Sequence, residues 1–312
     1  MKTYFILFLF FFFGCSSNSK TEYKIVYNVG YDIEADDYEI FIMDMDGSNK
    51  KNISNWKGVD WVYHAHKNKI FFISDRDTTH RFYYLYEMDI NGQNVRKISK
   101  FRLRDSWLDS RKNGQELIVS PHKSVDSVFY LIDLDGKILQ KVSTGLPYNS
   151  DPCFSPDGKQ IVFRGATKKS KREKGFIDEL YLINDEGKAL KQLTHYPPND
   201  TTAEWYAYKA GTPRWNSKEN FISYQSKQNG SYKLFAVTPD GKKQWLLTSS
   251  DKEEGWHDWS SDGQWLAVEI FDAGQSQFDI ALIDWQTKNM KILTDTTYKY
   301  QQAPVFVEIP NK

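Results

Sequence analysis

Short runs in which apolar and polar residues alternate fill most of the chain, and tight turns separate them. The run at 38–43 (Tyr-Glu-Ile-Phe-Ile-Met) is typical, and it ends at the turn 44–47 (Asp-Met-Asp-Gly). Alternation of this kind predicts strands with one buried face. An Asp-Gly or Asn-Gly turn between two such runs predicts a β-hairpin, because the turn residues must adopt positive φ. No stretch shows a sustained helical period, so the pattern indicates an all-β fold.

The hairpin turn recurs along the whole chain. Five clear copies and a weaker sixth stand at 44–47, 89–92, 133–136, 184–187, 238–241 and 284–287. About six residues after each turn, an apolar residue precedes a hydroxyl residue, which is Ser54, Ser99, Ser143, Thr194, Thr248 or Thr294. Successive hydroxyls are 45, 44, 51, 54 and 46 residues apart. Six copies at this spacing predict a propeller of four-stranded blades rather than a helical solenoid.

A second signature precedes the hairpin turn. Its clearest copy, at 151–163, reads Asp-Pro-Cys-Phe-Ser-Pro-Asp-Gly-Lys-Gln-Ile-Val-Phe, with a close copy at 257–268 and a looser one at 212–217. It describes an inner strand, a tight turn and a second apolar strand. The motif resembles the WD40-like (PD40) repeat of TolB propellers and of prolyl-oligopeptidase-type propellers, and the resemblance covers about residues 21–310. TolB propellers scaffold envelope proteins, so the resemblance implies a binding role.

The two ends of the repeat region are complementary. Residues 23–27 match a second strand with no inner strand before them, and residues 303–307 match an inner strand with nothing after them. The two ends should therefore complete one blade together, which leaves no exposed strand edge. The predicted fold class is an all-β, six-bladed β-propeller of four-stranded antiparallel blades, in a single domain at 22–310.

Residues 1–14 are predicted to be a signal peptide. Lys2 precedes about ten apolar residues, whereas a membrane-spanning helix needs about twenty. The following Phe-Phe-Gly-Cys at 12–15 resembles the lipobox of bacterial lipoproteins, and the Phe-rich core resembles Bacteroidetes envelope lipoproteins. This implies that Cys15 is acylated and that residues 15–21 form a polar tether. An ordinary signal peptide with an incidental cysteine is the alternative.

Lipid attachment implies a location in the cell envelope. Two acyl chains suffice to hold a protein stably on a membrane. The tether lacks the acidic run that resembles a surface-export signal in that phylum. We therefore expect the domain to be anchored at the outer membrane and to face the periplasm.

Charge and composition narrow the function classes. The 312 residues include 41 Lys+Arg and 41 Asp+Glu, and this balance argues against a nucleic-acid binder, whose affinity needs a basic footprint. The 20 Phe, 19 Tyr and 10 Trp supply ample apolar area for a folded core. Two cysteines cannot form a disulfide framework. We expect a monomer without a cofactor.

The candidate binding surface lies on two long loops of the fourth blade, at 165–178 and 195–211, which should be neighbours on the face opposite the hairpin turns. Functional residues favour such loops on a rigid scaffold. The candidate residues are Lys168, Lys169, Lys171 and Arg172 in the first loop, Trp205, Tyr206 and Tyr208 in the second, and Trp256 and His257 at the start of an inner strand. Together these residues predict a surface that binds an envelope protein, an anionic glycan or an anionic peptide. The alternative is a solvated basic loop beside aromatics that merely pack on the blade edge.

Three histidines are candidate metal ligands. Alternation places His64 and His66 on the same side of their strand, toward the hairpin-turn face, whereas His257 falls toward the other face. Carboxylates at equivalent strand starts could complete a site, namely Asp60, Asp151 and Asp258. The mismatch of faces makes a three-histidine site geometrically poor, so no metal is predicted. A propeller of the oligogalacturonate-lyase type, which uses histidine-held metal, is disfavoured for the same reason.

Catalytic motifs are absent from the sequence. It contains no Gly-x-Ser-x-Gly elbow, Walker A loop or dinucleotide-binding fingerprint, and Cys153 lies in an apolar strand as a buried, inert thiol. We therefore favour a non-catalytic binding protein. Two alternatives stay open: a carbohydrate-active lyase or hydrolase that uses aspartates around the central channel, and a sensor that binds a small ligand there.

Overall fold

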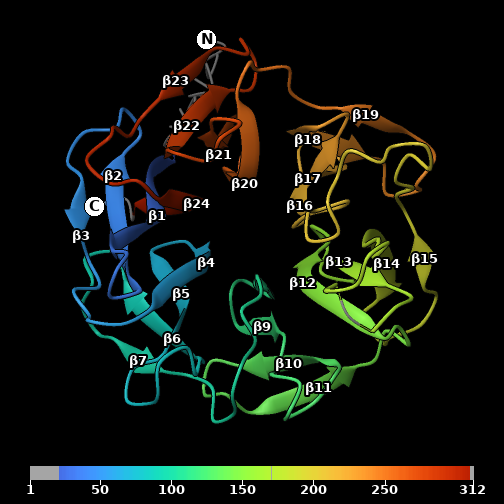
Figure 1. Ribbon diagram of the computed structural model, residues 1–312. Helices are drawn as coiled ribbons and strands as arrows, with labels where there is room; N and C mark the ends of the chain where they lie inside the picture. Colours follow the sequence, from blue (N-terminus) through green and yellow to red (C-terminus); the bar gives the residue numbers. More distant parts are fainter. Residues whose placement is uncertain (1–20, 170, 310–312) are drawn as a thin grey trace, which may run out of the picture.

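The computed structural model describes residues 21–169 and 171–309, and every regular element within them is a β-strand. Six four-stranded antiparallel sheets stand around a central axis as the blades of a propeller (Figure 1). The six predicted blades are confirmed. No helix in the described residues is both long and apolar enough to cross a membrane.

Within each blade the strands run from the central channel to the rim. Blade 1 contains β24 (Gln301–Ile309), β1 (Glu22–Asp32), β2 (Asp37–Asp44) and β3 (Lys51–Asn52). Blade 2 contains β4 (Asp60–His66), β5 (Lys69–Ser74), β6 (Tyr84–Asp89) and β7 (Arg96–Lys97). Blade 3 contains β8 (Asp109–Arg111), β9 (Glu116–Val119), β10 (Phe129–Asp133) and β11 (Ile138–Val142).

The second half of the ring repeats this order. Blade 4 contains β12 (Tyr148–Phe154), β13 (Gln160–Ala166), β14 (Glu179–Asn184) and β15 (Lys191–Gln192). Blade 5 contains β16 (Arg214–Asn216), β17 (Phe221–Gln228), β18 (Ser231–Val237) and β19 (Gln244–Leu246). Blade 6 contains β20 (Glu253–Trp259), β21 (Trp265–Phe271), β22 (Phe278–Asp284) and β23 (Met290–Ile292).

The ring closes in blade 1, where the last strand pairs with the first. β24 and β1 are antiparallel, with Ile25 opposite Phe306 and Val26 opposite Val305. Blade 1 therefore draws its inner strand from the C-terminal end of the chain and its other three strands from the N-terminal end. The predicted shared blade is confirmed.

The hairpin glycines explain why the repeat keeps its turn. Gly92 has φ of 81°, and a Cβ atom there would stand 2.1 Å from the carbonyl oxygen of Ile53 in the preceding blade. Gly136 makes the same approach to Ile98, where a Cβ atom would stand 2.0 Å from the carbonyl oxygen. Only glycine combines a positive φ with so close a contact. The turn thus joins neighbouring blades as well as neighbouring strands.

The recurring hydroxyls also have a physical role. Ser99 Oγ accepts a hydrogen bond of 2.8 Å from the N–H of Leu85 in the third strand of its blade. Thr194 does the same for the N–H of Leu180, at 2.8 Å, and donates to buried Glu179. The hydroxyl satisfies a backbone donor where the short fourth strand ends. This explains the second half of the sequence repeat.

The apolar core is divided into layers between blades. Phe129 of blade 3 and Phe163 of blade 4 meet edge to face, with ring centroids 5.5 Å apart, and both are fully buried. Trp259 and Trp285 of blade 6 meet at 4.7 Å beside Phe221 of blade 5. Aromatic side chains suit this packing because each covers a large area of the facing sheet.

The propeller has two faces, which we call the turn face and the loop face. The turn face carries the hairpin turns and the turns between first and second strands. Arg111 shows that these turns are neighbours, because its Nη1 atom donates to Gly158 O at 2.8 Å and to Asp185 Oδ2 at 2.7 Å. β1 begins on this face, since Lys24 pairs with Asp44 at the first hairpin turn. The loop face carries the loops at 165–178 and 195–211.

Candidate functional site

One residue from each inner strand occupies the same register position on the channel wall. We call this set the channel ring, and it consists of His64, Asp109, Cys153, Arg214, Asp258 and Val305. Four of the six are ionisable side chains of opposite charge types, and a fifth is a thiol. The ring therefore concentrates polar chemistry at the axis of the propeller.

Arg214 reaches across the channel. Its Nη2 atom donates to Tyr63 O at 3.1 Å, and its guanidinium carbon lies 3.9 Å from the centre of the Trp107 ring. On its own side, Nε donates to His257 O at 3.3 Å and lies 3.6 Å from Asp258 Oδ1. The residue is 5% exposed. Arg214 thus lies between a cavity on the turn face and another on the loop face.

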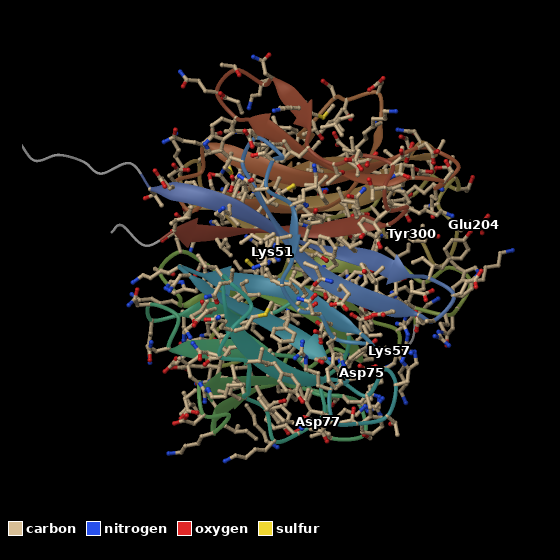
Figure 2. The ribbon with its side chains drawn as sticks, turned by 90° about the vertical axis from the view of Figure 1, so that its left-hand side faces the viewer. Lys51, Lys57, Asp75, Asp77, Glu204 and Tyr300 are labelled. Atoms are coloured by element: carbon tan, nitrogen blue, oxygen red, sulfur yellow. The ribbon has the colours of Figure 1, made fainter. Side chains whose placement is uncertain are left out.

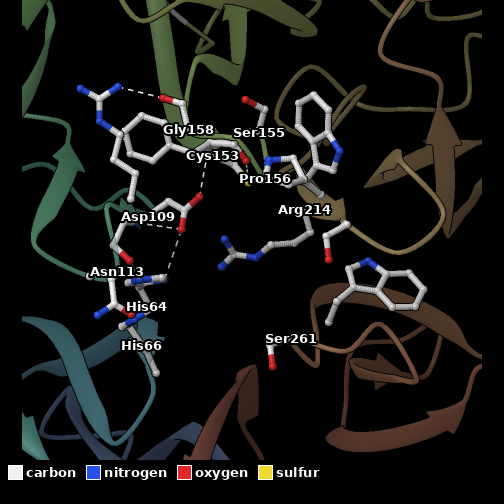
Figure 3. Close-up of a pocket in the computed structure, with 18 of the residues that line it drawn as sticks. His64, His66, Asp109, Asn113, Cys153, Ser155, Pro156, Gly158, Arg214 and Ser261 are labelled. Atoms are coloured by element: carbon white, nitrogen blue, oxygen red, sulfur yellow. Dashed lines mark hydrogen bonds and ion pairs between the residues drawn. The ribbon is translucent and has the colours of Figure 1, made fainter.

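The turn-face cup is the larger cavity, with a volume of about 670 Å³. Five residues of the channel ring, all except Val305, border it, and the turns around Lys67, Asn113, Gly158 and Ser261 form its rim. Figure 3 shows Arg214 extending into its middle, toward Asp109 and His64 on the opposite wall. Its volume lies in the range of about 300–1,000 Å³ that is usual for ligand sites.

Burial controls the charges at the floor of the turn-face cup. It raises the pKa of Asp258 to about 6, although the nearby Arg214 charge opposes the shift. Burial also raises the pKa of Asp109 and lowers that of His64 well below its usual value. His64 Nδ1 lies 3.6 Å from Asp109 Oδ1, beyond hydrogen-bond distance, so Asp109 does little to keep the imidazole charged. His64 is therefore neutral at pH 7.

Cys153 belongs to the same wall and is inert. Burial raises the pKa of its thiol well above the usual value, with the charge of Asp109 acting in the same direction. The thiolate is the reactive form, and here it is disfavoured. Among the described residues, no group of three or more His, Cys, Asp and Glu side chains is placed to hold a metal ion.

The loop-face cup is smaller, about 280 Å³, and seven of its sixteen lining residues are aromatic. Trp61 lies at the centre of one wall, with ring centroids 4.9 Å from Tyr38 and 6.0 Å from Trp256. Tyr63 and Trp107 continue this wall toward the floor, 5.0 Å apart. The wall is therefore built from blades 1, 2, 3 and 6.

The opposite wall of the loop-face cup comes from blade 4 and is basic. The ring of Tyr208 contacts two cations: the guanidinium carbon of Arg164 is 4.6 Å from its centre, and Lys171 Nζ is 5.4 Å from it. This contact joins the loops at 165–178 and 195–211, so the prediction that they are neighbours is confirmed. Arg164 is buried and paired with Asp151 at 2.9 Å.

The other candidate residues of the two loops lie further out. Trp205 and Tyr206 are 38% and 62% exposed and meet edge to face at 5.4 Å. Lys168, Lys169 and Arg172 are exposed, and Lys168 Nζ donates to Gly175 O at 3.4 Å within its own loop. Of the predicted basic residues, only Lys171 lines the loop-face cup.

Trp256 and His257 are adjacent in sequence but lie in different surroundings. Trp256 lines the loop-face cup. His257 is 1% exposed, and its Nε2 atom lies 2.7 Å from Ser223 Oγ in blade 5. Burial lowers the pKa of His257 to about 3. Trp256 therefore borders the loop-face cup, whereas His257 joins two blades.

The expectation that three aspartates occupy equivalent strand starts is wrong. Asp60 is the first residue of β4, where it is buried and paired with Arg76, but Asp151 lies within β12 and Asp258 next to the end of β20. Irregular pairing shifts the register between Ser150 and Cys153. Only Asp258 belongs to the channel ring, whereas Asp151 lines the loop-face cup.

Sequence reasoning missed Arg214, Asp109 and the aromatic wall around Trp61. A signal for Arg214 exists, because the loose signature copy at 212–217 places arginine where the clearer copies have Cys153 and Asp258. The identity of the channel-facing positions follows only from the strand register.

Comparison with known proteins agrees with this architecture. The family model of the TolB β-propeller domain (PD40) matches residues 65–307. A search among curated proteins gave no match.

Solved structures are similar over most of the chain. TolB from Acinetobacter baumannii has a TM-score of 0.67 and 15% identity, over 91% of this chain and 66% of that one. The putative TolB from Agrobacterium tumefaciens has a TM-score of 0.62 and 13% identity, over 94% of this chain and 100% of that one. Kuenenia stuttgartiensis hydrazine synthase has a TM-score of 0.65 and 13% identity, over 93% of this chain and 47% of that one. At such identities the likeness shows the fold alone, and this chain spans just under two thirds of the Acinetobacter protein.

Proposed function

Since the chain belongs to the family of TolB β-propeller domains, we propose that it is a non-catalytic binding protein of the cell envelope. In this proposal Cys15 carries a lipid anchor at the outer membrane, the propeller faces the periplasm, and the loop face binds a protein or glycan partner. Cys15 and the signal peptide lie outside the described residues. The chain acts as a monomer in this proposal.

The observation that carries the proposal is the exposed aromatic pair Trp205 and Tyr206 beside the loop-face cup. Exposed aromatic side chains of this kind are enriched at recognition surfaces, because they supply large contact areas with few rotatable bonds. Tyr208 of the same loop lines the cup together with Lys171 of the neighbouring loop. The pair and the cup thus share the loop at 195–211 as one candidate surface.

The position of β1 supports this choice of face. β1 begins on the turn face, so a tether of seven residues, 15–21, would hold that face within about 25 Å of the membrane. The loop face would then point away from the membrane. Figure 2 shows Glu204, Tyr300 and Lys57 on the side opposite the start of the blue first strand.

Two experiments test the proposal. Affinity capture from envelope extracts with the full chain should recover a partner that the variant Trp205→Ala/Tyr206→Ala fails to recover. The control is Ile292→Ala, an exposed apolar residue on the outer strand β23, which should capture normally. For the anchor, Cys15→Ser should move the protein from the membrane pellet to the soluble fraction. Equal capture by wild type and by the Trp205→Ala/Tyr206→Ala variant would refute the proposed binding surface. A Cys15→Ser variant that stays in the membrane pellet would refute the lipid anchor.

A second candidate function rests on the turn-face cup. Asp258, with a pKa of about 6, and Asp109, with a raised pKa, border the same cavity as Arg214. Shifted carboxyl groups in a cleft are typical of general acids and bases. A carbohydrate-active lyase or hydrolase would use them, and a glycan-degradation screen with wild type and Asp258→Asn would reveal it. An activity lost in the variant would favour the enzyme over the binding protein.

A further inference from the structure

The two walls of the loop-face cup differ in chemistry and face each other across the channel. In a six-bladed ring blade 4 stands opposite blade 1, as Figure 1 shows for β13 and β1. Tyr38, Trp61 and Trp256 form the aromatic wall around blade 1, and Lys171 belongs to blade 4. The cup thus offers ring faces on one side and a positive charge on the other.

Lys171 is the cation of the loop-face cup that remains for a ligand. Arg164 is paired with Asp151 and Asp178, at 2.9 and 3.3 Å, and Arg81 is paired with Asp36 at 2.5 Å. Lys171 has no carboxylate within 4 Å among the described residues. The charge of Arg164, with burial, lowers the pKa of Lys171. An anionic group beside Lys171 would relieve this repulsion.

Asp105 supplies the complementary polar group. Its side chain is open to the loop-face cup, and it accepts a hydrogen bond from the hydroxyl of Tyr63. Because the channel walls surround it, burial raises its pKa. A carboxyl group in this position is best satisfied by hydroxyl donors of a ligand. The indole N–H groups of Trp61, Trp107 and Trp256 also have no hydrogen-bond partner among the described residues.

We infer that the loop-face cup binds one hexuronic acid unit, with the carboxylate at Lys171, hydroxyls at Asp105 and the sugar ring against Trp61 and Trp256. The inference rests on the proposed role of the loop face in partner binding and names the chemistry of that partner. The indole N–H groups are buried, so they would donate to sugar oxygens only after the rings turn toward the ligand, which would satisfy these unpaired donors. The cavity of about 280 Å³ lies just below the range of about 300–1,000 Å³ that is usual for ligand sites. This small volume suits a single sugar unit.

Other ligand classes fit the cup less well. A neutral hexose leaves the charge of Lys171 without a partner. An aromatic carboxylate without hydroxyl groups, such as benzoate, stacks on the tryptophans and pairs with Lys171, but it brings no hydroxyl donors to Asp105. A hexuronate satisfies all three features at once.

Isothermal titration calorimetry on the full chain tests the inference. D-glucuronate or D-galacturonate at millimolar concentration should bind, and glucose and benzoate should bind at least about tenfold more weakly. Lys171→Met should weaken hexuronate binding about tenfold or more, because a hydrogen bond between charged groups is lost. Trp256→Leu should weaken it similarly through lost stacking. Lys174→Met, an exposed lysine of the same loop, should bind as wild type.

Each outcome separates this inference from the proposed function. Absence of hexuronate binding, equal binding of glucose or benzoate, or an unchanged affinity in Lys171→Met would overturn the inference. Envelope capture that still depends on Trp205 and Tyr206 would in that case leave the proposed function standing. A titration with an oligogalacturonide shows whether the cup is built for a free sugar acid or for the end of a glycan chain. If it is built for a chain end, the oligogalacturonide should bind more tightly than the monosaccharide.

Discussion

At the scale of single residues, Arg214 places a buried charge on the propeller axis. It belongs to blade 5 and makes hydrogen bonds to the backbone carbonyls of Tyr63 in blade 2 and His257 in blade 6. It also lowers the pKa of Asp258, which burial alone would raise further above its value of about 6. One side chain therefore joins blades 2, 5 and 6 and balances the carboxylates of the channel ring.

Replacement of Arg214 by leucine should reduce the free energy of unfolding by about 2–4 kcal/mol at pH 7, because buried acceptors and carboxylates lose their partner. The pKa of Asp258 should rise, so the loss should be larger at pH 8 than at pH 5. Chemical denaturation at the two pH values measures both effects. Arg214→Lys, which retains a charge, should lose less stability. A leucine variant as stable as wild type at pH 8 would contradict this role.

At the scale of the structural elements, each hairpin turn couples two blades. Gly92 in the turn after β6 touches Ile53, which follows β3 of the preceding blade. Gly145 provides a natural comparison, because its φ of 72° is also positive while no atom lies within 4 Å of a Cβ atom built there. A comparison of the two positions therefore separates the cost of backbone strain from the cost of a steric contact.

Gly92→Ala should therefore destabilise the protein more than Gly145→Ala. The Gly145 variant carries only the strain of a left-handed backbone, about 1–2 kcal/mol. The Gly92 variant must also displace a backbone carbonyl, so we expect a loss of about 3 kcal/mol or more. Thermal or chemical unfolding of both variants gives the comparison. Equal losses would show that the contact with Ile53 is unimportant.

The same elements show what a single sequence can predict. Turns such as 89–92 and hydroxyls such as Ser99 recur because they meet a backbone requirement of the blade, as the hydroxyls at 54, 99, 194 and 294 do. The blade count followed from them, and the ring closure followed from the complementary runs at 23–27 and 303–307. The channel was not predictable in this way, because irregular pairing between Glu254 and His257 and between Ser150 and Cys153 changes which side chains face the axis. The alternation of apolar and polar residues along a strand does not reveal such a change in pairing.

At the scale of the whole molecule, the joint between blades 6 and 1 determines whether the ring stays closed. Glu269 in β21 accepts a hydrogen bond of 3.2 Å from the N–H of Ala303 in β24. Burial raises the pKa of Glu269 to about 8. The folded protein therefore holds this proton more tightly than the unfolded chain does, so the stabilisation is complete below about pH 4.5 and is lost as pH rises through about 8.

Glu269→Gln should remove this pH dependence, because the amide keeps a hydrogen-bond acceptor and cannot ionise. Wild type and variant should have similar unfolding free energies near pH 5, whereas at pH 9 the variant should be more stable by about 2–4 kcal/mol. Denaturant titrations across this pH range measure the difference. Glu34→Gln, at an exposed glutamate, should leave the wild-type profile unchanged. Parallel profiles for wild type and Glu269→Gln would contradict the assigned role.

Ring closure itself can be tested by removing the last strand. β24 pairs with β1 along most of its length and also lies against blade 2, where Glu308 N–H donates to Lys67 O at 2.9 Å. Deletion of residues 302–312 should leave the edge of β1 unpaired and one wall of the channel missing, so cooperative unfolding should be lost and aggregation should increase. Deletion of 310–312 alone should preserve the melting transition. A 302–312 deletion that melts at the wild-type temperature would mean that the other five blades, rather than the shared one, hold the ring together.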